Sequence, residues 1–125
     1  MSLISGWMGH ASALDVAKLQ KDFAPYMVDG ESMVAGYQLV RDLLVFTNKR
    51  LILVDKQGMT GKKTEYMTIP YTSIVRFSKE SAGTFDLDSE FKIWVRGQEA
   101  PIVREFKKDD HVDVVYRLLS QAVLT

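Results

Sequence analysis

The stretch Leu43-Leu44-Val45-Phe46-Thr47-Asn48-Lys49-Arg50-Leu51-Ile52-Leu53-Val54 consists of two apolar runs on either side of a polar tetrad. Each run is too short for a helix, and the asparagine in the tetrad tolerates the left-handed backbone of a tight reversal. The stretch therefore predicts a β-hairpin, with residues 47–50 as the turn that sets its register rather than as a basic recognition tip. Neither run alternates between polar and apolar residues, which indicates that both faces of the hairpin are covered.

Seven strands are predicted, because turn residues punctuate the chain at short intervals between residues 31 and 107. We expect them to form an antiparallel meander. The predicted strands are Ser32–Val40, Leu43–Thr47, Arg50–Asp55, Lys63–Ile69, Ser73–Lys79, Ser89–Arg96 and Pro101–Lys107.

Two helices are predicted to flank the strands. The first runs from Ser12, as N-cap, to Ala24, and the second runs from Asp110 to Leu124. Either the apolar face of the first helix, a neighbouring subunit or both would cover the outer face of the hairpin. That helix face consists of Val16, Leu19, Phe23 and Met27.

The composition is that of one small globular domain. The 125 residues can bury a single core, and we divide them into an N-terminal helical arm, residues 1–30, and a folded domain, residues 31–125. The 16 basic side chains balance the 16 acidic ones, so nucleic acid is not an expected partner. Cysteine is absent from the sequence, which excludes disulfides and thiol catalysis and is compatible with the reducing cytoplasm, where we expect the protein.

Several separated segments of the chain, in the same order, resemble the bacterial pleckstrin-homology (PH) domain family. They are Val45–Asp55, Gly58–Lys63, Ile69-Pro70-Tyr71 and Ala82–Asp88. The resemblance covers nearly the whole chain and implies an α+β, mainly β, PH-like fold: a seven-stranded antiparallel sheet or open barrel that is capped by a C-terminal helix. It also implies a small protein without assigned catalysis that assembles into a ring-like homo-oligomer.

Apolar side chains that a core does not need are candidates for self-association. Trp94 lies on the polar face of an otherwise alternating strand, and the closing helix has an apolar sector wider than one contact face. The candidates are Leu44, Phe46, Ile52, Val54, Trp94 and Leu118. We expect a non-catalytic interaction module that forms a homo-oligomer, cyclic if different surfaces of each copy meet.

A cluster of basic residues offers a second function. Hairpin topology places Arg41, Lys56, Lys62 and Lys63 at one end of the sheet, where they could attract an anionic membrane surface. In eukaryotic PH domains, phosphoinositides bind a long loop between the first two strands, whereas here that connection is only Arg41-Asp42. The alternative is therefore a peripheral membrane binder of weak affinity.

No catalytic, cofactor-binding or metal-binding residue is predicted, and no small-molecule substrate is identified. The two histidines, His10 and His111, lie at opposite ends of the chain without ligand spacing around them. Gly58–Thr64 lacks the spacing of a phosphate-binding loop. We therefore expect that the protein is not an enzyme. The remaining aromatic residues of the strands are assigned to the core, namely Tyr66, Tyr71, Phe77, Phe85, Phe91 and Phe106.

Overall fold

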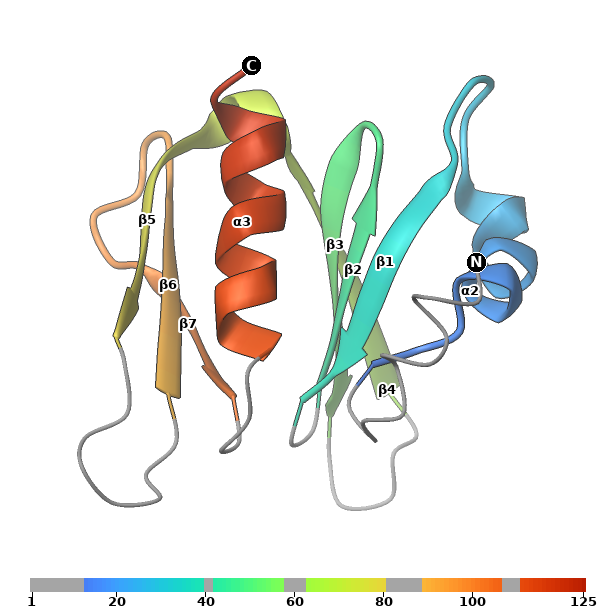
Figure 1. The fold of residues 1–125 in the computed structure, drawn as a ribbon, viewed down its shortest axis with the longest axis horizontal. Coiled ribbons are helices and arrows are strands. Elements are labelled where there is room, and N and C mark those ends of the chain that lie inside the picture. The colour runs from blue at the N-terminus through green and yellow to red at the C-terminus, as the bar shows by residue number, and fades with distance from the viewer. Residues whose placement is uncertain (1–12, 40–41, 58–62, 81–88, 107–110) are drawn as a thin grey trace. The chain divides into compact units, whose positions relative to one another are not determined.

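The computed structural model describes residues 13–39, 42–57, 63–80, 89–106 and 111–125, which belong to two compact units, Met1–Thr68 and Ile69–Thr125 (Figure 1). Within these described ranges, seven strands in two sheets, with a helix before them and a helix after them, confirm the predicted α+β class. Among the described residues, no helix is long and apolar enough to span a membrane.

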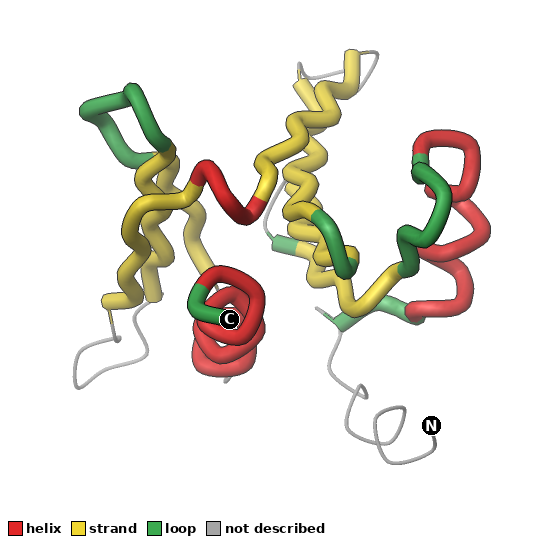
Figure 2. Tube along the Cα trace, turned by 90° about the horizontal axis from the view of Figure 1, so that it is seen from above, coloured by secondary structure: helices red, strands yellow, loops and turns green. Residues whose placement is uncertain are grey.

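The first unit contains a helix and a four-stranded sheet with the strand order β1-β2-β3-β4. Viewed from above, helix α2 lies beside one face of this sheet (Figure 2). The elements are α2 Val16–Phe23, the 3-10 helix η1 Ala24–Tyr26, β1 Met33–Gln38, β2 Asp42–Thr47, β3 Arg50–Gln57 and β4 Lys63–Pro70.

Helix α2 begins later than the sequence predicts. Asp15 is its N-cap, and one carboxylate oxygen of Asp15 accepts a hydrogen bond from the Ala17 amide at 3.1 Å. The prediction that Ser12 caps the helix is wrong, and Ser12 lies outside the described residues. Aspartate and serine cap helices about equally well, so the composition alone does not separate the two starts.

The predicted hairpin is formed by β2 and β3, in which Val45 lies opposite Ile52 and Leu44 opposite Leu53. On one face of the hairpin, Val45 and Ile52 are buried together with the apolar face of α2. On its other face, Leu44 is 0% exposed and Leu53 is 1% exposed. Helix α2 therefore covers one face of the hairpin from within the same chain. The buried cluster consists of Leu19, Phe23, Met33, Val45, Ile52 and Val54.

The second unit is a three-stranded antiparallel sheet with the order β5-β6-β7 and a helix against it. The ring of Tyr116 in the helix meets the ring of Phe77 on β5, with centroids 5.3 Å apart, and that of Phe91 on β6 at 6.5 Å. This contact seats the closing helix on the sheet. The elements are η2 Tyr71–Ser73, β5 Ile74–Glu80, β6 Ser89–Val95, β7 Ile102–Phe106 and α3 His111–Val123.

Candidate functional site

The turn between β2 and β3 is held by its own side chains. Thr47 Oγ1 accepts hydrogen bonds from the backbone amides of Lys49 and Arg50, both at 3.0 Å. Asn48 Oδ1 accepts a hydrogen bond from the Ser32 amide at 2.8 Å, and Asn48 Nδ2 donates one to the Gly30 carbonyl at 3.0 Å. Residues 47–50 are therefore fixed against the loop that leads into β1.

Next to this turn lies an ion pair between Glu31 and Arg50. Arg50 donates from Nε to one carboxylate oxygen at 2.8 Å and from Nη2 to the other at 2.9 Å. The Thr47 hydroxyl donates to the same carboxylate at 2.6 Å, and the Val28 amide donates at 3.0 Å. The Glu31 side chain is fully buried, so these four bonds replace its hydration.

These bonds explain why the pair stays ionised. The hydrogen bond from Arg50 is the largest cause that lowers the pKa of Glu31 to about 2, and the bonds from Thr47 and Val28 add to it, while burial acts in the opposite direction. The hydrogen bond to Glu31 in turn raises the pKa of Arg50. A carboxylate held in this way serves to hold the structure together rather than to move protons.

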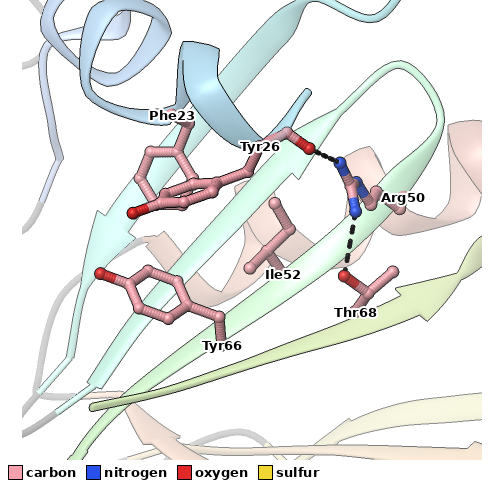
Figure 3. Close-up of a pocket in the computed structure, with 6 residues that line it drawn as sticks. All are labelled: Phe23, Tyr26, Arg50, Ile52, Tyr66 and Thr68. Carbon is pink, nitrogen blue, oxygen red and sulfur yellow. Dashed lines mark hydrogen bonds between the residues drawn. The ribbon is translucent and has the colours of Figure 1, made fainter. Parts of the chain in front are cut away.

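Beside the ion pair, the first unit has a pocket of about 210 Å³ with mostly apolar walls (Figure 3). Helix α2 and η1 provide one wall, while β3 and β4 provide the other. The lining residues are Phe23, Tyr26, Arg50, Ile52, Tyr66 and Thr68.

Three aromatic rings contact one another in this pocket. The ring centroids of Tyr26 and Tyr66 are 5.5 Å apart, and Phe23 meets both rings edge-on at 6.2 and 6.1 Å. Despite this contact, Tyr26 is 56% exposed and Tyr66 is 51% exposed. Paired large rings that remain half in solvent are typical of a contact surface.

The polar groups of the pocket lie at its two ends. At one end, Arg50 donates from Nη1 to Thr68 Oγ1 at 3.1 Å and from Nη2 to the Tyr26 carbonyl at 2.7 Å. The hydroxyl groups of Tyr26 and Tyr66 lie at the other end, away from the guanidinium (Figure 3). Within the described part of the chain, no group of three histidine or acidic side chains is arranged to hold a metal ion.

Comparison with known families identifies the chain: the model of the bacterial PH domain family matches residues 2–123. The chain belongs to the bacterial PH domain family. It is 54% identical over 121 residues to the uncharacterized protein YjqA of Bacillus subtilis strain 168. The aligned region covers 96% of this chain and 97% of that protein.

Two solved structures share the fold. A pleckstrin homology domain from Shewanella amazonensis SB2B has a TM-score of 0.85 and 46% identity, over 98% of this chain and 99% of that one. A DUF1696 family protein with a pleckstrin-homology domain, from Shewanella loihica PV-4, has a TM-score of 0.83 and 43% identity, over 92% and 98%. The predicted family and the PH-like fold are thereby confirmed.

The basic residues proposed for lipid contact in this bacterial PH domain are only partly placed. Lys56 on β3 and Lys63 on β4 are exposed, whereas Arg41 and Lys62 lie outside the described residues. Strand β1 ends at Gln38 and β2 begins at Asp42, so the connection is short, but Asp42, which was predicted to lie in it, belongs to β2. The role of the four residues stays a prediction.

The residues proposed for self-association are mostly buried in the single chain. Leu44, Phe46, Ile52 and Val54 have exposures of 0% to 3% within the single chain. Trp94 is half-buried beneath the guanidinium of Arg76, which lies 4.4 Å from the ring centroid. Leu118 is also half-buried. Self-association through these six residues stays a prediction.

Sequence reasoning missed the aromatic pocket. It assigned Tyr66 to the core, where Phe91 and Phe106 do lie, but Tyr66 is half-exposed on β4, whose residues 63–68 are all exposed. The physical reason is that β4 is the last strand in the order of its sheet. The threonines on either side of Tyr66, at positions 64 and 68, were the available signal that this face of the strand is wet.

Proposed function

We propose that this bacterial PH domain is a non-catalytic interaction module of the cytoplasm that assembles into a homo-oligomer. The observation that supports an interaction role is the pair of touching, half-exposed rings of Tyr26 on η1 and Tyr66 on β4. A soluble protein keeps large rings at its surface chiefly where something binds.

The charged side chain in the pocket, Arg50, favours a binding role over a catalytic one. Among the described residues that line it, Arg50 is the only charged one, and its partner Glu31 has its pKa lowered to about 2, far from the range of a proton-transfer group near neutral pH. The remaining lining groups are hydroxyls and apolar side chains, without an adjacent base in the described lining. These features support a role in recognition.

Exposed aliphatic side chains support the homo-oligomer. They occur in both units: Val34 on β1 is 44% exposed, Val75 on β5 is 54% exposed, and Leu124 after α3 is 75% exposed. Contacts between such different surfaces are heterologous, and heterologous contacts form a closed ring when the rotation between copies closes. A cyclic assembly is the form we propose.

Size-exclusion chromatography with light scattering at micromolar concentration tests the assembly. The expected result is one species whose mass is a multiple of 14.2 kDa. Leu124→Asp should lower this mass, while the matched control Gln121→Asp, at an exposed polar position of α3, should not. A wild-type monomer would overturn the homo-oligomer.

Attraction to an anionic membrane is the alternative function. The exposed side chains of Lys56 and Lys63 support it, at about 1 kcal/mol for each basic residue near the surface. Sedimentation with phosphatidylserine vesicles at low and high salt is the measurement. Salt-sensitive binding that is lost in the double variant Lys56→Gln, Lys63→Gln would favour this alternative.

A further inference from the structure

The chain that precedes helix α2 joins the fold at the edge of β1 that does not pair with β2. Ala13 forms an isolated antiparallel bridge with Tyr37, and the Leu14 amide donates a hydrogen bond to the Gly36 carbonyl at 2.9 Å. Because the bridge is antiparallel, Ala13 is joined to the preceding chain on the side of Gln38, where β1 ends. Residues 1–12 themselves lie outside the described structure.

The hydroxyl groups of the aromatic pocket lie toward the same end of the sheet. Strand β3 begins at Arg50, and the hydroxyls of Tyr26 and Tyr66 lie beyond Ile52, away from the guanidinium (Figure 3). Strands β1 and β3 both pair antiparallel with β2, so they run in the same direction and finish at the same end. The attachment point of residues 1–12 and the hydroxyl end of the pocket therefore share one end of the sheet.

The distance between the two places is within reach of the chain. The sheet order puts β4 three strand spacings from β1, which is about 14 Å. Trp7 precedes Ala13 by six positions, and six extended residues span about 20 Å. The side chain of Trp7 can therefore reach Tyr66 of its own chain.

The composition of residues 1–12 favours burial of this segment. It contains no aspartate, glutamate, lysine or arginine, although these residues make up 26% of the chain. Its large apolar side chains include those of Leu3, Ile4, Trp7 and Met8. An uncharged segment with such side chains gains free energy when it covers an apolar surface.

We propose that Trp7 of the same chain occupies the pocket, so that residues 1–12 form an intramolecular cover over Tyr26 and Tyr66. The faces of the indole match the apolar rings, and its single N–H can donate to a tyrosine hydroxyl, which accepts as well as donates. The volume of about 210 Å³ suits one large side chain and is below the roughly 300–1,000 Å³ of small-molecule pockets. Covalent attachment favours this occupant over a free apolar partner, because a short linker gives millimolar effective concentrations.

The cover is an autoinhibitory contact for the surface on which the proposed interaction role depends. A partner that binds Tyr26 and Tyr66 must displace Trp7, so its apparent affinity is reduced by the fraction of chains that are covered. The inference rests on the proposed role of these two rings in binding but not on the homo-oligomer.

Acrylamide quenching of Trp7 fluorescence in the full chain tests the cover. The chain has two tryptophans, so Trp94→Phe leaves Trp7 as the single reporter. Trp7 should be quenched less in this chain than in a synthetic peptide of residues 1–12. Tyr66→Ala, added to Trp94→Phe, should weaken docking by about tenfold or more and raise the quenching constant towards that of the peptide. Glu65→Ala, on the opposite face of β4, is the matched control and should leave the quenching constant unchanged.

Quenching of Trp7 as in the peptide, or no rise in quenching on Tyr66→Ala, would overturn the inference. Circular dichroism checks the fold of each variant, and Tyr66 is half-exposed, so its replacement should be tolerated. If Trp94→Phe does not fold, the difference in emission between the wild type and Trp7→Phe reports the same side chain.

A mixture of two variants shows which copy supplies the segment. The Tyr66→Ala chain, which carries the reporter, is refolded together with an excess of Trp7→Phe chain, which has an intact pocket, and both carry Trp94→Phe. Trp7 should stay as exposed to acrylamide as in the Tyr66→Ala chain alone. Regained protection would show that Trp7 binds a second copy and would overturn the intramolecular cover.

The oligomeric mass is measured separately by light scattering. An oligomer in which Trp7 is quenched as in the peptide would defeat only the cover. A wild-type monomer in which Trp7 is protected would defeat only the homo-oligomer.

Discussion

Arg50 holds Glu31 with two parallel hydrogen bonds, from Nε at 2.8 Å and from Nη2 at 2.9 Å, across 19 positions of sequence. The bond connects the first residue of β3 to the loop that leads into β1. Through its remaining nitrogen, Arg50 also reaches Thr68 on β4. One side chain therefore links the first, third and fourth strands at one end of the sheet.

Removing one member of this pair should cost more than removing both. Arg50→Met leaves the buried carboxylate of Glu31 without its main partner, and we expect the free energy of unfolding to fall by about 3–5 kcal/mol. The double variant Glu31→Leu, Arg50→Met removes both charges and should regain most of this loss. Urea denaturation at pH 7 measures both. Equal losses in the single and double variants would contradict a buried, paired carboxylate.

The same pair predicts how stability depends on pH. The folded-state pKa of Glu31 is about 2, against 4.5 for an unperturbed glutamate. A lowered pKa stabilises the fold above the unfolded value, so the contribution of about 3 kcal/mol is complete above pH 5 and is lost as the pH falls towards 2. Urea midpoints of the wild type and Glu31→Gln at pH 7, 5, 3 and 2 measure it. The difference between the two proteins should shrink at low pH, and a constant difference would contradict the assignment.

The hairpin and the helix face were predictable because the information is local. Residues 43–54 carry both strands and their turn in one stretch, and Val16, Leu19, Phe23 and Met27 repeat at helical spacing. The start of the first helix was not predictable, because Ser12 and Asp15 are both suitable N-caps.

The ion pair and the aromatic pocket could not be predicted, since their members come together only in the folded sheet. Glu31 and Arg50 are polar residues in two turn regions, and hydrophobic periodicity carries no information on how turns meet. Tyr26 and Tyr66 lie 40 positions apart in sequence, and their contact forms only when the fold brings the ring on η1 to the ring on β4. Sequence pattern assigned Tyr66 to the core because aromatic residues in strands are usually buried.

Asn48 should be the most sensitive exposed residue of the hairpin turn. Asn48→Ala removes two hydrogen bonds, one from the Ser32 amide at 2.8 Å and one to the Gly30 carbonyl at 3.0 Å. We expect a loss of about 1–3 kcal/mol in the free energy of unfolding. Lys49→Ala, at the next exposed position, is the matched control and should change stability by less than about 0.5 kcal/mol. Similar losses in the two variants would show that the amide of Asn48 does not hold the turn.

Gly36 should be required because helix α2 lies directly against it. A Cβ at this buried position of β1 would overlap Cδ1 of Leu19, which is itself buried in the cluster under α2. We therefore expect Gly36→Ala to lower the free energy of unfolding by about 1–3 kcal/mol, because the leucine must leave its rotamer or the helix must shift. The double variant Gly36→Ala, Leu19→Ala tests the cause, because without the leucine the added methyl group fills space instead of creating a clash. Urea denaturation of the four proteins in this cycle should show that Gly36→Ala costs less, or nothing, in the Leu19→Ala background. Strictly additive losses would mean that the helix does not approach β1 at this point.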